Sequence, residues 1–134
     1  MQRLSGLVTL LILALVLAVV HSLAFEYFWY WQYWWLDLVM HFGAGVFVAG
    51  IVYISGVTKR TVLLVAIALV VGSSWEVFEF VFRVPYSRSF VLDTGLDLLM
   101  DAAGALALSG MLWWWRIAVS PSSAVRAASL DQTF

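Results

Sequence analysis

The N-terminal region contains the stretch LSGLVTLLILALVLAVVHSLAF, residues 4–25, which has no acidic residue, lysine or arginine. A helix rises 1.5 Å per residue, so about 20 apolar residues are needed to cross the ~30 Å hydrocarbon core of a bilayer. Three later stretches, residues 36–55, 61–82 and 94–115, are similar in length and mostly apolar. The sequence therefore predicts an all-α integral membrane protein, a bundle of four transmembrane helices joined by short loops.

The composition agrees with a chain whose solvent is lipid. Hydrophobic residues make up 64% of its 134 residues and charged residues 11%, whereas soluble domains average ~25% charged. The net charge of −1 gives no basic surface for nucleic acid, which we exclude as a partner. The absence of cysteine excludes disulfides and thiolate metal ligands. We expect one transmembrane domain over residues 1–116 and a polar C-terminal tail over residues 117–134.

The first apolar stretch has a second interpretation. Arg3 precedes the apolar run and the small-residue sequence Ser22-Leu23-Ala24 ends it, as in a cleaved signal peptide. The stretch is nevertheless long enough to span the membrane, and we favour an uncleaved helix.

Lysine and arginine predict the orientation, because they concentrate in cytoplasmic loops. If the chain crosses four times, five of these residues fall on one side: Arg3, Lys59, Arg60, Arg116 and Arg126. Two fall on the other side, Arg83 and Arg88. We therefore expect a multi-pass protein of the cell inner (plasma) membrane with both termini in the cytoplasm.

One of the predicted outward loops is almost wholly aromatic: residues 25–35 read FEYFWYWQYWW. Tryptophan and tyrosine prefer the headgroup layer, where an apolar ring and a polar tip are both satisfied. We interpret this loop as an interfacial anchor, in preference to a platform for ligand stacking.

Ionisable side chains form one stripe on each of the last three predicted helices. Residues three or four apart lie on the same face of a helix. An ionisable group inside a span costs ~2.5–3.5 kcal/mol on insertion scales, so such residues are rarely accidental. The stripes are Asp37 and His41, then Glu76 and Glu79, and finally Asp93, Asp97 and Asp101.

These stripes are expected at one depth, one to two turns inside the outer surface, because successive helices alternate in direction. Several carboxylates at that depth cannot all stay ionised unless a cation lies among them or some are protonated. Carboxylates with one imidazole suit a divalent ion such as Mg, Mn, Zn, Ca or Fe. The predicted metal ligands are His41, Glu76, Glu79, Asp97 and Asp101, with Asp37 and Asp93 as further candidates.

Two of the acids have a simpler explanation. Asp37 precedes an apolar run and serves equally well as the N-cap of the second span. For Asp93 we favour the N-cap over the ligand, because Thr94 and Gly95 follow it where the fourth span is expected to begin. His21 has no ionisable neighbour on its own helix, and we assign it to packing at the rim.

The remaining assignments concern chemistry. Glu76 or His41 is the predicted general base. Arg83 and Arg88 are the predicted substrate-binding residues, since guanidinium groups bind anions in a bidentate manner, although both also suit snorkelling to headgroups.

The pattern Asp37-x-x-x-His41, Trp75-Glu76-x-x-Glu79 and Asp93-x-x-x-Asp97-x-x-x-Asp101-x-x-Gly104-Ala105 resembles the VanZ-like small bacterial membrane proteins and their YjdF-like inner-membrane relatives. The resemblance covers about residues 36–105 and implies a membrane fold of four to five helices. Arg88 and Asp93 match an Arg and an Asp of the VanZ-like pattern. Glu79 replaces a Gln, as in the YjdF-like branch, so glycopeptide resistance is not transferred to this chain.

Three functions remain open on the sequence. The first is a metal-dependent enzyme acting on a membrane lipid or lipid-linked substrate of the cell envelope. The second is a cation- or proton-binding protein, and the third is a non-catalytic component whose buried charges hold the helices together. A bis-histidine haem on His21 and His41 is a remote fourth. A homo-oligomer is compatible with each of them.

Overall fold

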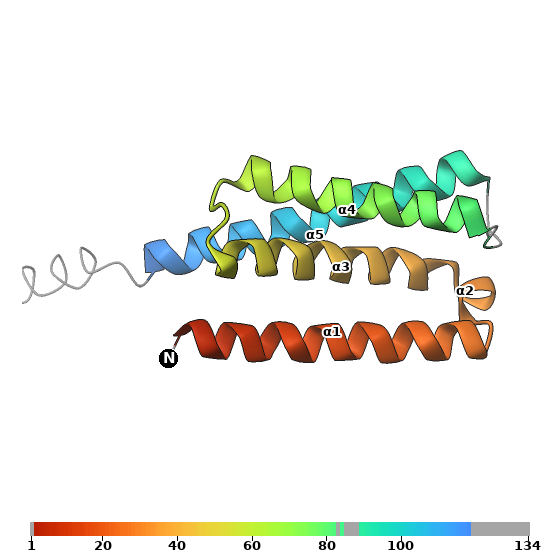
Figure 1. Ribbon diagram of the computed structural model, residues 1–134, viewed down its shortest axis with the longest axis horizontal. Helices are drawn as coiled ribbons and strands as arrows, with labels where there is room; N and C mark the ends of the chain where they lie inside the picture. Colours follow the sequence, from red (N-terminus) through yellow and green to blue (C-terminus); the bar gives the residue numbers. More distant parts are fainter. Residues whose placement is uncertain (1, 83, 85–88, 119–134) are drawn as a thin grey trace, which may run out of the picture.

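The computed structural model describes residues 2–82, 84 and 89–118, and it confirms the all-α membrane-type bundle (Figure 1). Four of its helices are long and apolar enough to cross a membrane. The helices are α1 (Gln2–Glu26), α2 (Trp29–Gln32), α3 (Trp34–Ser55), α4 (Thr61–Phe82) and α5 (Phe90–Ala118). Arg83, Arg88 and nearly all of the predicted tail lie outside the described residues.

The helix starts correct both N-cap assignments. Helix α5 begins at Phe90, and the Ser89 carbonyl accepts the first backbone hydrogen bonds, from the amides of Leu92 and Asp93 at 3.0 Å. Asp93 therefore lies in the first turn and is not the cap. Asp37 likewise lies in the first turn of α3, whose N-cap is Tyr33. Both helices thus begin three residues before the acid, at Trp34 and at Phe90.

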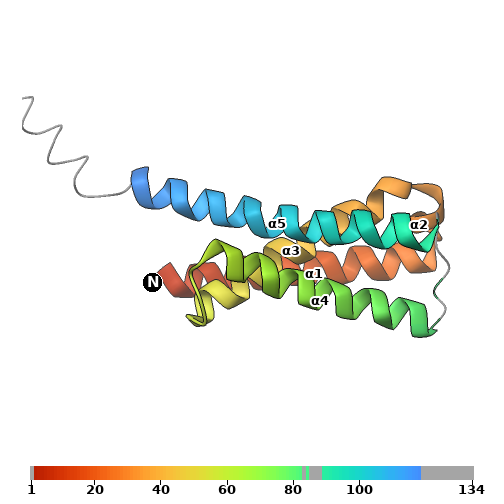
Figure 2. The same ribbon diagram turned by 90° about the horizontal axis from the view of Figure 1, so that it is seen from above.

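Helix α3 is the centre of the bundle. It packs against α5, α4 and α1, and α4 also packs against α5. Helix α1 rests on α3 and α2 and has no comparable packing against α4, so it lies at one side of the bundle (Figures 1 and 2). The small apolar core lies between α3, α4 and α5 and consists of Ala49, Leu64, Ala68 and Ala105.

Glycines bring α3 and α5 into backbone contact. A Cβ atom at Gly45 would overlap the main chain of Asp101, and one at Gly104 would overlap the carbonyl of Phe42. Without a side chain at these positions, the two helix axes can approach closely, as is typical of membrane helix pairs. A Cβ at Gly72 of α4 would overlap the Asp101 carboxylate itself. Three helices therefore fix the position of Asp101.

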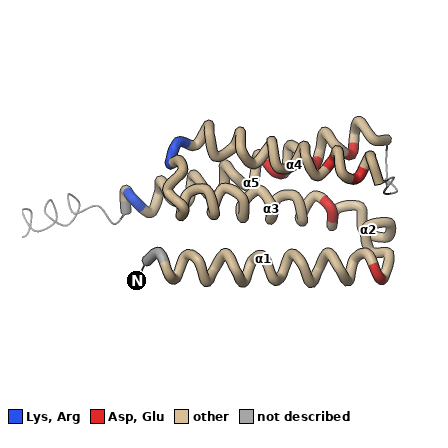
Figure 3. The backbone as a smooth tube through the Cα atoms, in the orientation of Figure 1, with Lys and Arg blue, Asp and Glu red and all other residues tan. Residues whose placement is uncertain are grey.

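Charges are separated along the long axis of the bundle. All described acidic residues lie in the half that carries α2, whereas the described lysine and arginine side chains lie at the opposite end (Figure 3). There, Arg116 donates a hydrogen bond to the Tyr53 hydroxyl at 2.6 Å. The predicted depth of the acidic stripes thus agrees with the fold.

Candidate metal centre

His41 of α3 is the centre of the acidic cluster. It is 7% exposed, and its Nδ1 lies 3.2 Å from Oδ2 of Asp101 on α5. Asp101 is 2% exposed, and its position is fixed by the glycine contacts described above. A carboxylate on Nδ1 orients an imidazole and leaves Nε2 for a ligand, as in carboxylate–histidine–metal arrangements.

Nε2 of His41 faces two further carboxylates, that of Glu76 on α4 and that of Asp37 one turn earlier on α3. It lies 3.7 Å from Oε1 of Glu76 and 4.0 Å from Oδ1 of Asp37. These distances exceed the ~3.2 Å limit of an N–H···O hydrogen bond. Two atoms that bind one small divalent ion at ~2.0–2.2 Å can be up to about 4.3 Å apart. The spacing is therefore too long for direct hydrogen bonds and suitable for a shared ion.

Glu76 of α4 has one satisfied and one unsatisfied oxygen. Its Oε2 accepts a hydrogen bond from the Thr94 hydroxyl at 2.6 Å. Its Oε1 is buried and has no hydrogen-bond partner. The side chain is only 5% exposed, so bulk water does not reach this oxygen. A buried acceptor without a partner costs ~1–3 kcal/mol, and more when it is charged. This unpartnered oxygen faces His41 Nε2 and therefore points into the cluster.

A fourth ligand candidate comes from α5. One ligand atom each from Asp37, His41 and Asp97 lie within 4.8 Å of one another. Asp97 is 2% exposed and Asp93, one turn earlier, is 8% exposed. The structure thus brings most of the predicted ligands together, with Asp37 among them.

Glu79 has a different environment from the other predicted ligands. Its Oε1 accepts a hydrogen bond from Trp75 Nε1 at 2.9 Å, on the same helix. It is half-buried and takes no part in the described ion pairs of His41, which are with Asp37, Glu76 and Asp101. The predicted substrate-binding residues, Arg83 and Arg88, cannot be placed, since they lie outside the described residues.

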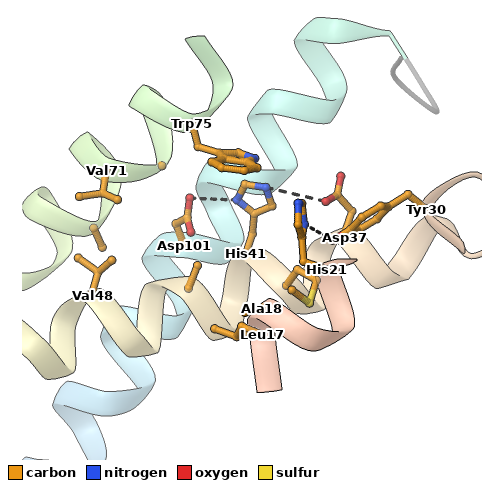
Figure 4. Close-up of a pocket in the computed structure, with 14 residues that line it drawn as sticks. Leu17, Ala18, His21, Tyr30, Asp37, His41, Val48, Val71, Trp75 and Asp101 are labelled. Atoms are coloured by element: carbon orange, nitrogen blue, oxygen red, sulfur yellow. Dashed lines mark hydrogen bonds and ion pairs between the residues drawn. The ribbon is translucent and has the colours of Figure 1, made fainter. Parts of the chain in front are cut away.

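A pocket of about 280 Å³ opens beside the cluster (Figure 4). His41, Asp37 and Asp101 line it together with His21 of α1 and Tyr30 of α2. His21 Nδ1 and the Tyr30 hydroxyl are 2.8 Å apart, and the His21 ring also contacts the edge of Trp75. The packing assigned to His21 thus includes a place in the wall of the pocket.

Tyr30 belongs to the aromatic loop, and its ring lines the pocket. Burial raises the pKa of Tyr30, and the nearby carboxylates of Asp37 and Glu79 raise it further. The phenol therefore keeps its proton. The sequence held a weak signal for this pair, the similar depth of His21 and the loop, but the partners belong to different segments.

Thr94 is predicted to hold Glu76 in its ligand position. Thr94→Val keeps the shape of the side chain and removes the hydroxyl that donates to Oε2. We expect divalent-metal affinity to fall by about 10-fold, the lower end of the effect of losing an outer-shell partner. Titration of purified protein with Mn²⁺ measures this change, and Thr61→Val at the far end of α4 is the matched control. Equal affinities in the two variants would contradict the assignment.

Comparison with known proteins adds no relative: no family model, curated protein or solved structure matches the chain. The similarity to VanZ-like and YjdF-like proteins therefore stays a prediction. Function has to be argued from the site itself.

Proposed function

We propose that this protein is a membrane-embedded enzyme that uses a divalent metal ion, bound by His41, Glu76, Asp37 and Asp97, on a lipid or lipid-linked substrate. The observation that carries the proposal is the buried Oε1 of Glu76, which has no hydrogen-bond partner and lies 3.7 Å from His41 Nε2. A buried carboxylate oxygen without a hydrogen-bond partner costs free energy, and a bound ion would supply the missing partner.

The donor set limits the choice of metal. One imidazole and three carboxylates favour Mn²⁺, Fe²⁺, Zn²⁺ or Mg²⁺ over soft ions. Asp101 would not bind the ion, because it contacts Nδ1 of His41 and so directs Nε2 toward Glu76 and Asp37.

The chemistry follows from a metal next to an open pocket. When bound, a divalent ion supplies Lewis-acid catalysis, making water a better nucleophile and neutralising charge on a phosphoryl or carbonyl oxygen. Asp101 keeps the His41 ring in one orientation and tautomer. The carboxylate of Asp37 lines the pocket, and that of Glu76 lies 3.7 Å from His41 Nε2. These are the groups that could accept a proton from a reacting water. Arg83 and Arg88 remain our candidates for binding an anionic substrate.

A second function is favoured by one observation. Three carboxylates, from Asp37, Glu76 and Asp101, lie within 4.0 Å of His41, so a protonated His41 could act as the ionic centre of a non-catalytic bundle. Individual polar contacts between membrane helices are worth only ~0.6 kcal/mol on average, and one imidazolium leaves most of the acids uncompensated. A proton or ion path has less support, because the other half of the described bundle has an apolar core.

Metal analysis of purified protein tests the proposal. We expect one Mn²⁺ or Zn²⁺ per chain after dialysis, and His41→Ala to lose it. His21→Ala is the matched control, because it removes the pocket's other imidazole, which is outside the ligand group. Absence of stoichiometric metal in the wild-type protein would reject the metal centre and leave the ionic role of His41.

The orientation can be tested with single cysteines, because the chain has none of its own. We propose that α2 faces outward and that both termini are cytoplasmic in the plasma membrane. A membrane-impermeant maleimide should then label Tyr33→Cys in intact spheroplasts, and Val57→Cys only after permeabilisation. Both positions are exposed in loops at opposite ends of the bundle. The reverse pattern would place the pocket on the cytoplasmic side.

A further inference from the structure

The pocket beside the metal centre is a lateral groove between two transmembrane helices. Its walls come from α1 and α4, whose backbones lie apart although the rings of His21 and Trp75 meet at one end, and its floor is α3. The groove is hollowed at the side of the bundle, within the length of the membrane spans. Its opening therefore faces the bilayer at the depth of the hydrocarbon.

The lining changes character along the groove. Away from the acidic end it consists of aliphatic side chains, among them Leu17, Val48 and Val71. From Ala44 to Val48, the apolar part of the floor runs for about 6 Å at 1.5 Å per residue of helix. The groove is thus apolar over a length that accommodates a segment of a single hydrocarbon chain.

The outer end of the groove is polar. His41, Asp37 and Asp101 belong to the metal centre, and the His21–Tyr30 pair faces it from the α1 side (Figure 4). The contact with Tyr30 occupies Nδ1 of His21, so Nε2 is the ring atom that can meet a ligand. A polar head at this end would lie between His21 and the ion.

We infer that the groove binds one hydrocarbon chain of a membrane lipid with an anionic head, entering between α1 and α4, with the head placed between His21 and His41. The head-group part rests on the proposed function, because a divalent ion is what attracts an anion to this acidic end. The chain part rests on the groove alone. At this depth the surrounding solvent is lipid, and only an occupant that is apolar at one end and charged at the other fits the lining.

A photo-reactive lipid analogue tests the inference. The probe is hexadecyl phosphate with a diazirine in the middle of its chain, added to the full-length protein in phosphatidylcholine nanodiscs with Mn²⁺. After irradiation, peptide mass spectrometry locates the label. We expect more labelling on the groove segments of α1, α3 and α4 than on the sides of the same helices that face away from the groove.

Two neighbouring valines of α4 supply a matched pair of variants. Val71 lines the groove, whereas Val70 is exposed on another face of the helix. Val71→Trp fills the groove and should lower labelling of the groove segments by at least about five-fold, whereas Val70→Trp should leave it within about two-fold. Equal labelling in both variants, or label spread evenly around the bundle, would overturn the inference.

The same samples separate this inference from the proposed function. Mn²⁺ binding is measured alongside labelling, and both valine variants should retain it. Unselective labelling with intact Mn²⁺ binding removes the lipid groove and leaves the metal centre. Groove labelling in a protein that binds no Mn²⁺ supports the chain site and rejects the metal centre.

His21→Ala tests the head-group end and keeps the groove. It should reduce labelling by the phosphate probe. Labelling by hexadecanol that carries the same diazirine should not change.

Discussion

Replacing Glu76 by glutamine should lower the affinity for Mn²⁺ by at least about 100-fold, since loss of an outer-shell partner alone costs 10–100-fold. The substitution keeps the size of the side chain and its contact with Thr94, and it removes the charge at Oε1, the atom that faces His41. A neutral amide is a much weaker ligand for a hard divalent ion than a carboxylate. Calorimetric titration of the purified protein measures the change.

Glu79→Gln is the control for this experiment. It makes the same chemical change three residues later on α4, at a carboxylate that is half-buried and bound to Trp75. We expect affinity within about three-fold of the wild-type protein, since this carboxylate is bound to Trp75 and forms none of the described ion pairs with His41. A loss of Mn²⁺ affinity equal to that of Glu76→Gln would show that Glu79 is a ligand, as the sequence pattern predicts. It would also contradict the distinction between Glu76 and Glu79.

The thermal stability of the metal-free variants adds a second readout. If His41 is instead an ionic centre, removing the Glu76 charge breaks a buried pair, which typically costs ~3–5 kcal/mol. If the site is built for a metal, the metal-free protein has an excess of negative charge, and Glu76→Gln should leave its melting temperature unchanged or higher. A large drop in the presence of a chelator would therefore favour the structural function.

Gly45→Ala should destabilise the bundle and impair the metal site together. The new Cβ would overlap the main chain of Asp101, so α3 and α5 must separate. Overpacking of this kind typically costs ~1–3 kcal/mol, and here the obstacle is backbone, which cannot move aside as a flexible side chain can. The same displacement moves Asp101 relative to His41, so Mn²⁺ affinity should also fall. Thermal unfolding in detergent, followed by circular dichroism, measures the first effect.

Gly110→Ala is the control on α5. A Cβ there would meet no atom within 4 Å, so the substitution only replaces a flexible residue with a better helix former. We expect unchanged or slightly increased stability and unchanged Mn²⁺ affinity. If both alanine variants behaved alike, close contact between the α3 and α5 backbones would not explain how Asp101 is held.

The sequence alone determined the four long helices, apart from the early starts of α3 and α5, and the common level of their acidic residues. Residues 61–82 were predicted as a span and form α4 over the same residues, because backbone groups in hydrocarbon must be satisfied within the helix itself. The common level of the acids also followed from the sequence, since length and alternating direction place each residue at a given depth. Both properties depend on one helix at a time, which explains why a linear pattern contains them.

The tertiary structure decided which side chains meet. The orientation of each helix about its own axis depends on contacts such as Gly45 against Asp101, which no single segment specifies. That orientation directs Glu76 to His41 and leaves Glu79 on Trp75, although both acids belong to one stripe. It also brings Tyr30 of the aromatic loop to His21. The level of a residue along the bundle is determined by its own helix in lipid, whereas the side chains that it contacts are determined by packing between helices.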